Sequence, residues 1–523
     1  RGLGDVYKRQ DITRAAALIE EDGALVTLIG PGGVGKTRLA IELGARATES
    51  FKQRVHFVDL VPVSSDAALV EMVAEIVGAR RQPGMDLVDS IADDLAGRRT
   101  LLILDNCEHL IAEVREFVIR LVDVGGVHVL ATSREALGVP DEQQIIVSPL
   151  DVVAAGVELF VDRARRREHR FELNADNEAG VRAVVRHLDG IPLAIELAAA
   201  RIRLMTPAEI ADRLGSGIDV LDRGVRGGRH ETMRDTIRWS YNLLDPSEAR
   251  LFERSSVFAG GFDLEAAEFI CADDPVVTRS DVPQLIMTLL DKSMIDSTDV
   301  GGRQRFRMLE PLREFAADEL RESGETQRYR DRHAAFYLAL AQRESERFFS
   351  PAEPDVWRVL DVEWSNFRTA LDTFERAGDL DSGAELVIAL VWFAAMSMRF
   401  ELFGWAAELL DAPGVERHPR FTDLCGAVAV GSYFTLDGDV TERAEIGLAA
   451  DPSDPEGLCR CALALVFLNN EHTAEASDAV TSAWLASAPG AIGSRLWAHG
   501  FRVFHLCIHD PGPEMAEQAA AVT

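Results

Sequence analysis

Eight residues, GPGGVGKT at positions 30–37, limit the possible folds of this chain more than any other feature. The pattern G-x-x-x-x-G-K-[ST] marks a phosphate-binding loop when an apolar strand precedes it and a helix follows it. Both neighbours are predicted here, the strand from LVTLIG (25–30) and the helix from RLAIELGARA (38–47). We therefore expect contacts to a bound nucleotide from one continuous run of residues: Gly30, Pro31, Gly32, Gly33, Val34, Gly35, Lys36, Thr37 and Arg38.

The chemistry of this loop follows from its residue types. Glycines let backbone N–H groups turn towards phosphate oxygens, and the helix N-terminus adds its positive end. Lys36 is expected to reach the β- and γ-phosphates, and the hydroxyl of Thr37 to bind Mg²⁺. The alternative, a glycine-rich turn that only resembles the motif, is disfavoured by the flanking strand and helix.

Five short apolar segments alternate with helical ones between residues 11 and 150. Their nearly continuous apolar character is typical of strands buried on both faces of a parallel sheet. The alternation predicts a doubly wound α/β domain. The expected strands are Leu25–Gly30, Val55–Leu60, Thr100–Asp105, Val127–Ser133 and Gln143–Leu150.

Polar residues follow two of these strands. Asp105 ends the segment TLLILD, at the sheet edge where a phosphate loop also lies, so it is expected to hold Mg²⁺ directly or through water. A helix-capping Asp is the alternative. Asn106 can orient water but cannot accept a proton. Glu108 is a candidate base or only a helix-starting acid, and Arg134, in ATSRE, is a candidate γ-phosphate sensor or an exposed arginine.

After residue 150 the pattern becomes helical, and the length of 523 residues suits about three to four domains. Helices are expected at Val157–Arg167, Asn177–Leu188, Leu193–Leu204 and Thr206–Leu214. The expected divisions are a P-loop domain at 11–150, a helical subdomain at 151–235, a winged-helix-like subdomain at 236–320 and helical repeats at 325–523. A linker is expected at Asp222–His230. The winged-helix-like subdomain is expected to contain a short hairpin-like element, in which FRML (306–309) follows the glycine-rich turn VGGRQ (300–304).

The repeats are inferred from alanines Ala407, Ala444, Ala479 and Ala516, spaced 37, 35 and 37 residues apart. Helix pairs of about 35 residues stack into a solenoid; an irregular helical domain is the alternative. The apolar run Leu386–Met398, 13 residues long, is too short to cross a bilayer and suits a buried helix.

The composition limits the classes of partner that this chain can be expected to bind. A net charge of −31 argues against a chain wrapped on DNA or lying on an anionic membrane. The six scattered cysteines suit reduced thiols in a cytoplasmic protein. Residues 1–10, RGLGDVYKRQ, resemble a translated sequencing adapter and are set aside, so we expect the natural termini to lie outside the printed sequence.

Several motifs, taken in order, resemble the STAND class of P-loop ATPases. They are LIGPGGVGKTRLA, LLILDNCEHL, VLATSREALGVP, DGIPLAIELAAARI, TIRWSYNLLDPSEARLFERSSVFAGGFDLEAA and FRMLEPLREFA. Over residues 11–320 the chain is most similar to the NB-ARC-related ATPase module of large multidomain bacterial transcriptional regulators. The tail resembles the TPR-like sensor arrays that follow this module.

The resemblance implies a nucleotide switch with ATP or ADP and Mg²⁺ as cofactors. It implies that ADP holds a closed form, and that an inducer on the repeats promotes exchange for ATP, opening and self-assembly. By the family pattern Pro192 lies against the nucleotide and Arg134 is the sensor arginine. The chain departs from that pattern where Met308, Leu309 and Glu310 replace a Met-His-Asp motif, and where an upstream Gly-Arg-Glu element is absent.

The sequence is compatible with three hypotheses of function. The first is a signalling ATPase with slow hydrolysis. The second is a turnover ATPase, a motor or remodeller, which predicts a good base after Asp105, where the sequence offers Asn106. The third makes the winged-helix unit a DNA reader, but residues 236–320 carry 16 acids against 9 basic residues. We therefore expect no nucleic acid contact from this chain and no membrane partner.

Overall fold

The computed structural model describes residues 9–21, 24–61, 63, 66–82, 85–122, 126–218, 229–435 and 438–469. These residues form two compact units. The first draws on Arg1–Leu69 and Ala92–Phe336, and the second on Val70–Ile91 and Tyr337–Thr523.

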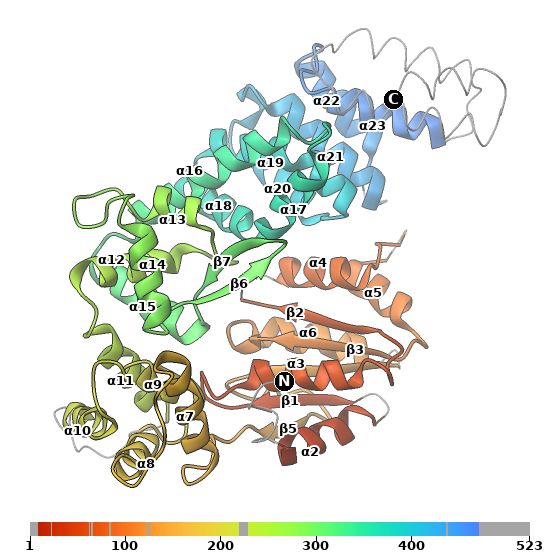
Figure 1. Cartoon of the computed structure of the whole chain (residues 1–523). Coiled ribbons are helices and arrows are strands. Elements are labelled where there is room, and N and C mark those ends of the chain that lie inside the picture. The colour runs from red at the N-terminus through yellow and green to blue at the C-terminus, as the bar shows by residue number, and fades with distance from the viewer. Residues whose placement is uncertain are drawn as a thin grey trace. The chain divides into compact units, whose positions relative to one another are not determined.

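The first unit is built on a five-stranded parallel sheet with strand order β2-β3-β4-β1-β5 (Figure 1). The strands β3 and β4 are buried at every position, as expected for a parallel sheet covered on both faces. Their bounds are β1 Leu25–Ile29, β2 Val55–Asp59, β3 Thr100–Asp105, β4 Val127–Ser133 and β5 Gln143–Ile146.

All five predicted strands are present, and the last one differs most in length. The edge strand β5 stops at Ile146 rather than Leu150, because Ile146 already pairs with Ile29, the last residue of β1. With no partner strand beyond that point, the following residues leave the sheet.

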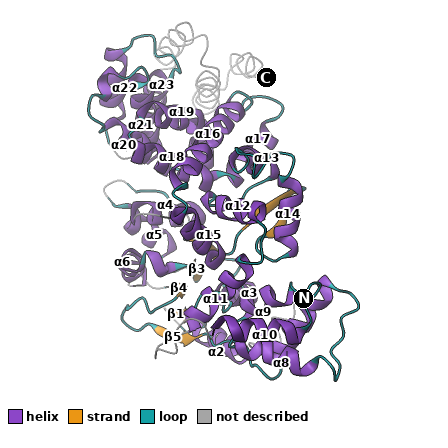
Figure 2. Ribbon diagram, turned by 90° about the vertical axis from the view of Figure 1, so that its left-hand side faces the viewer, coloured by secondary structure: helices purple, strands orange, loops and turns teal. Residues whose placement is uncertain are grey.

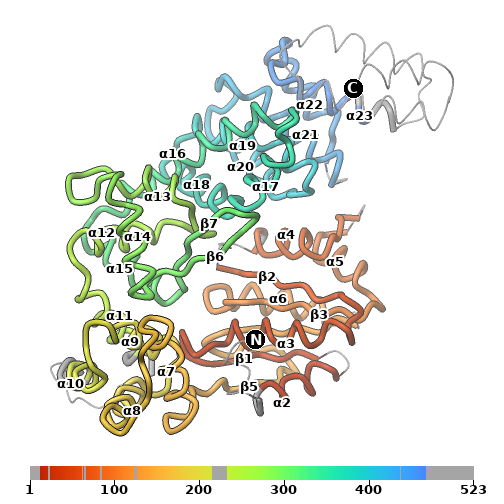
Figure 3. The backbone as a smooth tube through the Cα atoms, in the orientation of Figure 1, coloured from red at the N-terminus to blue at the C-terminus, as the bar shows by residue number. Residues whose placement is uncertain are grey.

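Helices α2 (Arg9–Ile19) and α3 (Lys36–Ala47) pack on the sheet and on each other, and the smooth trace in Figure 3 shows α2 beside β1 and β5. Their apolar side chains form one core with strands β1, β3, β4 and β5. Because α2 begins at Arg9, this helix includes Arg9 and Gln10, which the sequence analysis set aside.

The rest of the first unit is largely helical. The bounds of several predicted helices differ from the structure here, and the helix expected at 206–214 runs on to Ile218. The helix expected at 193–204 ends at Ala199, because tighter turns bond Arg201 N–H to Ala198 and Ile202 N–H to Ala199. The linker was expected to reach His230, but a helix already begins at Arg229; residues 219–228 lie outside the described residues.

The helices are α6 Ile111–Val122, α7 Ala155–Arg167, α8 Glu178–His187, α9 Pro192–Ala199, α10 Pro207–Ile218, α11 Arg229–Tyr241, α12 Pro246–Arg254, α13 Leu264–Ile270, α14 Val282–Asp291 and α15 Glu310–Glu322, with short 3₁₀ turns at Cys107–His109 and Ser255–Val257.

A β-hairpin, β6 (Asp296–Val300) and β7 (Arg303–Arg307), interrupts these helices. Its two-residue turn has φ values of 62° at Gly301 and 82° at Gly302, a backbone that glycine adopts without strain. The strand β7 ends two residues before the predicted Leu309, because Leu309 caps α15 and Pro311 stands in the first turn of that helix.

The second unit consists of helices over its described residues, which appear in purple in Figure 2. Helices α4, α5 and α16 cross the boundary between the units. Its elements are α4 Asp66–Val77, α5 Leu87–Leu95, α16 Thr326–Ser345, α17 Glu353–Val362, α18 Trp364–Ala377, α19 Leu380–Ser397, α20 Glu401–Leu410, a 3₁₀ turn at Val415–Arg417, α21 Phe421–Thr435, α22 Val440–Ala450 and α23 Leu458–Asn469.

Ala407 and Ala444 lie in α20 and α22, whereas Ala479 and Ala516 fall outside the described residues. The apolar run at 386–398 belongs to α19, which is 18 residues long and 56% buried over its most apolar window. By length and composition it is the one described helix that could cross a bilayer, which is weak evidence because buried core helices pass the same test. The five described cysteines are buried and unpaired.

Candidate functional site

The phosphate loop joins β1 to α3, as predicted. Gly33 and Gly35 have φ values of 72° and 95°, and a Cβ atom on Gly33 would lie 2.7 Å from Met233 Cε and 3.0 Å from Leu193 Cβ. Only glycine therefore fits at position 33, where the loop meets α9 and α11. The N–H of Leu193 also donates to Gly33 O at 3.3 Å, which ties the start of α9 to the loop.

Lys36, the first residue of α3, folds back over the loop. Its Nζ donates to Gly30 O at 2.8 Å and lies 3.4 Å from Pro31 O. Burial lowers the pKa of this ammonium, while nearby Glu108 acts in the opposite direction. These carbonyls hold the cation at the sheet edge, where phosphate oxygens would replace them as partners.

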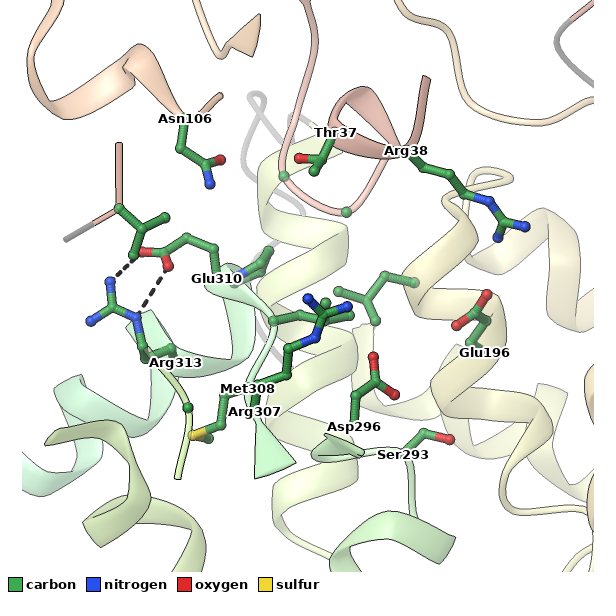
Figure 4. Close-up of a pocket in the computed structure, with 18 of the residues that line it drawn as sticks. Thr37, Arg38, Asn106, Glu196, Ser293, Asp296, Arg307, Met308, Glu310 and Arg313 are labelled. Atoms are coloured by element: carbon green, nitrogen blue, oxygen red, sulfur yellow. Dashed lines mark hydrogen bonds and ion pairs between the residues drawn. The ribbon is translucent and has the colours of Figure 1, made fainter. Parts of the chain in front are cut away.

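A cavity of about 890 Å³ opens in front of the loop within the first unit (Figure 4). Its lining brings together the loop, the ends of β2, β3 and β4, helices α7 and α9, the segment 258–262, and the junction of β7 with α15. Most predicted site residues line it: Gly32, Gly33, Gly35, Lys36, Thr37, Arg38, Asp105, Asn106, Glu108, Arg134 and Pro192. Gly30, Pro31 and Val34 do not line it, and of these Gly30 and Val34 are buried.

Asp105 is held at the carboxyl end of β3, as the sequence predicted. Thr132 Oγ1, from the end of the neighbouring strand β4, donates to Asp105 Oδ1 at 2.5 Å, and the Thr37 side chain lies beside the same carboxylate. Burial raises the pKa of Asp105 to about 6, and the side chains of Thr132 and Thr37 act to lower it. Thr37 and Asp105, the predicted Mg²⁺ pair, thus lie side by side.

Asp59 lies beside Asp105, because the two acids are register partners at the ends of β2 and β3. Asp59 lines the cavity, accepts a hydrogen bond from Val61 N at 3.0 Å, and lies close to the Asn106 side chain. Burial among protein atoms raises the pKa of Asp59, while Arg313 and Arg307 act to lower it. The sequence signal for Asp59 is that it stands next to last in the expected strand VHFVDL.

Asn106 turns the chain with φ of 61°, and its N–H donates to Thr132 Oγ1 at 3.0 Å. This turn leads into the 3₁₀ segment that carries Glu108. One oxygen of Glu108 accepts from Arg134 Nε at 3.0 Å, and the other is buried without a hydrogen-bond partner among the described residues. Glu108 therefore lines the cavity rather than only starting a helix.

Arg134 joins two acids from different parts of the unit. Besides Glu108, it pairs with Glu314 on α15, and its side chain is 26% exposed. Burial acts to lower the pKa of Arg134, but Glu314 and Glu108 outweigh it and leave the pKa raised. Glu314 could not be predicted as a partner, because 180 residues separate it from Arg134.

The far wall of the cavity comes from the β7–α15 junction. Met308, Leu309 and Glu310 line it, and Glu310 pairs with Arg313 at 2.8 Å (Figure 4). Pro192 faces the cavity from the first turn of α9. Several further lining residues come from distant segments and were not predicted from the sequence: Arg163, Arg166, Arg167, Glu196, Phe258, Phe262, Asp296 and Arg307.

The charge of the lining differs from that of the chain. Eight basic and six acidic side chains line the cavity, whereas the whole chain carries a net charge of −31. A cavity with an excess of cations attracts an anionic ligand. Its volume also suits a ligand the size of a nucleotide.

The cavity edge can also accommodate a divalent cation. Among the described residues, no cluster of three or more His, Cys, Asp or Glu side chains forms a closed metal site. Mg²⁺ bound with a nucleotide needs no such cluster, since phosphates and waters supply most of its ligands. The position of Thr37 beside Asp105 fits this limited donor set.

Comparisons with known proteins agree with these features. A family model described as an AAA domain matches residues 19–138. The putative HTH-type transcriptional regulator Rv0890c of Mycobacterium tuberculosis is 39% identical over 421 residues, covering 79% of this chain and 46% of that protein. The uncharacterized protein Rv0894 of the same organism is 36% identical over 308 residues, 58% of this chain and 78% of that protein.

The chain thus spans about half the length of the regulators that it matches. Among solved structures, it is similar to a Signal Transduction ATPase with Numerous Domains (STAND) protein with a tetratricopeptide repeat sensor, PH0952 from Pyrococcus horikoshii. That similarity covers 98% of this chain and 82% of the other at 13% identity, with a TM-score of 0.45.

Proposed function

The chain belongs to the family of Rv0894 and the HTH-type transcriptional regulators that it matches, with an AAA-type P-loop ATPase domain, and from this premise we propose that it is an ATP/ADP-binding signalling switch of the STAND class. The switch hydrolyses ATP slowly and couples inducer sensing by the helical repeats to opening and self-assembly. It acts in the cytoplasm and controls transcription through a domain outside the printed sequence.

One observation carries this proposal. The phosphate loop and Asp105 form one side of the cavity, and the β7–α15 junction forms the other. A nucleotide in that cavity contacts both sides at once, so the presence of a third phosphate changes the contacts across it. Differential contacts of this kind are what a ligand needs in order to shift a conformational equilibrium.

We assign Mg²⁺ to Thr37 and Asp105, where it neutralises phosphate charge when bound. We propose a separate role for each residue around the nucleotide. Lys36 binds phosphate oxygens, Arg134 senses the γ-phosphate, and Pro192 packs against the nucleotide from α9. Thr132 orients the Asp105 carboxylate through its hydrogen bond.

We expect ATP hydrolysis to be slow because of the residues that follow Asp105. Asn106 holds no basic group and cannot accept a proton from water. Glu108, the nearest acid, is paired with Arg134 in this structure. One of the two oxygens of Glu108 is therefore already engaged by a guanidinium.

The finer architecture belongs to the same proposal. We assign residues 151–235 to a helical subdomain, 236–320 to a winged-helix-like subdomain and 325–523 to a TPR-like α-solenoid. To move the ratio of open to closed protein from 1:99 to 99:1, a ligand must bind the open state more tightly by about 5.5 kcal/mol. Several charge-assisted hydrogen bonds to the γ-phosphate, each worth about 1.5–3 kcal/mol, are sufficient.

The test is steady-state phosphate release at saturating Mg²⁺ and ATP. The switch predicts a turnover below about 1 s⁻¹, the lower end of the usual enzyme range. Turnover well above that rate would instead support a motor or remodeller. The Lys36→Ala variant, which loses the ammonium of the loop, is the matched control for contaminating hydrolysis.

A further inference from the structure

Most arginines that line the cavity are already paired with carboxylates. Arg134 pairs with Glu108 and Glu314, and Arg313 with Glu310. Three arginines of α7 line the cavity, and their acidic partners are Asp162, Glu196 and Asp291. They are Arg163, Arg166 and Arg167. These guanidinium groups are therefore occupied when the cavity holds only solvent.

Arg307 is different. It lines the cavity, its residue is exposed, and no ion pair among the described residues includes it. Figure 4 shows its side chain rising from the end of β7 into the cavity, towards the phosphate loop. Asp296 is its cross-strand partner, yet the two side chains do not form an ion pair within 4.0 Å.

The same strand provides a contrast. Arg303, Arg305 and Arg307 alternate along β7 and so share one face of the hairpin. Arg305 is buried and donates to Gly261 O at 3.1 Å, which supports the segment 258–262. Arg303 is exposed and lies outside the cavity lining. Arg305 thus serves the hairpin structurally, whereas Arg307 presents its donors to the cavity.

The other lining arginine without an ion pair among the described residues is Arg38. It directly follows the phosphate loop and was predicted from that motif. Arg307 lies on the opposite wall, 271 residues later in the chain, and no motif pointed to it. An anion in the cavity can therefore meet free guanidinium donors from both walls.

We propose that Arg307 binds the phosphate chain of the nucleotide from the hairpin side of the cavity, opposite Lys36. This inference rests on the proposed function, since it assumes a nucleotide in this cavity. A guanidinium matches phosphate oxygens with two parallel hydrogen bonds, which an ammonium cannot do. Arg307 is then the residue through which the β7–α15 junction senses the nucleotide.

The experiment measures the affinity of the full chain for ADP and for AMP by calorimetry, together with the thermal midpoint without nucleotide. Losing a charge-assisted hydrogen bond predicts that Arg307→Ala binds ADP about 10- to 100-fold more weakly. The affinity for AMP should fall less, so the preference for ADP over AMP decreases. Arg307→Lys, which keeps the charge, should recover part of the loss.

Arg303→Ala is the matched control, since it removes the same charge from the same strand outside the cavity. It should leave ADP affinity unchanged. Equal loss of ADP and AMP affinity in Arg307→Ala, with a lower thermal midpoint, would overturn the inference in favour of a structural role. ADP affinity within twofold of the wild type would also overturn it.

The experiment distinguishes a failure of the proposed function from a failure of the role of Arg307. If the wild-type chain binds neither ADP nor ATP, the proposed function fails. If the wild type binds ADP and Arg307→Ala binds it equally well, only the role of Arg307 fails.

Discussion

The contact between Arg134 and Glu314 gives the sharpest prediction about the switch. Arg134 cannot pair fully with Glu314 and with a γ-phosphate at the same time, because its guanidinium is already divided between Glu314 and Glu108. Removing the Glu314 charge by Glu314→Gln should therefore favour ATP over ADP. Only the ATP state needs Arg134 released.

The magnitude follows from the exposure of the pair. The Arg134 side chain is 26% exposed and that of Glu314 is 44% exposed. Pairs of this kind contribute about 0.2–1 kcal/mol after screening by water. At the upper end, 1 kcal/mol corresponds to a change of about fivefold in an equilibrium constant, since about 1.4 kcal/mol corresponds to tenfold.

The assay is a pair of calorimetric titrations, one with ADP and one with a non-hydrolysable ATP analogue. Glu314→Gln should shift the ratio of the two affinities about two- to fivefold towards the ATP analogue. Glu322→Gln removes the same charge from an exposed position of the same helix and is the control. An unchanged ratio, or a shift towards ADP, would refute the reasoning.

Three other predictions concern the base, a buried acid and nucleic acid. Glu108→Gln should lower residual hydrolysis by about 100-fold while ATP still binds, because its partnerless buried oxygen lines the cavity; unchanged phosphate release would show that Glu108 is not the base. In the second unit, burial, followed by the charge of Glu401, raises the pKa of Glu71 to about 8. An acid with a raised pKa stabilises the fold below its unfolded pKa, and that stability is lost as the pH rises through about 8. Glu71→Gln should therefore raise the thermal midpoint at pH 9 and leave it unchanged at pH 4, and an equal effect at both pH values would contradict this cause. Finally, the full chain should show no salt-dependent affinity for duplex DNA in fluorescence anisotropy, because residues 236–320 carry 16 acids against 9 basic residues; salt-dependent binding would support the DNA-reader alternative.

The parallel sheet was predictable because its strands are nearly continuous apolar segments with polar ends. Asp105 was predictable for the same reason, since it directly ends such a segment. The two-glycine turn of the hairpin was also visible as VGGRQ. In each case the signal lies within a few neighbouring residues.

The charged residues Glu314 and Arg307, on the side of the cavity opposite the loop, were not predictable in this way. Glu314 and Arg307 approach the loop only through tertiary packing, and each resembles an ordinary surface charge in the sequence. The second unit shows the same limit. Glu75, from the segment between β2 and β3, pairs at 3.3 Å with Arg399, more than 300 residues later. Such pairings depend on the folded chain and leave no local pattern.

The most direct test of the switch is to identify the nucleotide that the purified chain retains. Protein from cells grown without added inducer would be exchanged into nucleotide-free buffer, denatured, and its supernatant examined by mass spectrometry. The account predicts ADP, at about one molecule per chain, held in the cavity between the phosphate loop and the β7–α15 junction. Protein that retains no nucleotide and also fails to bind added ADP or ATP would contradict it.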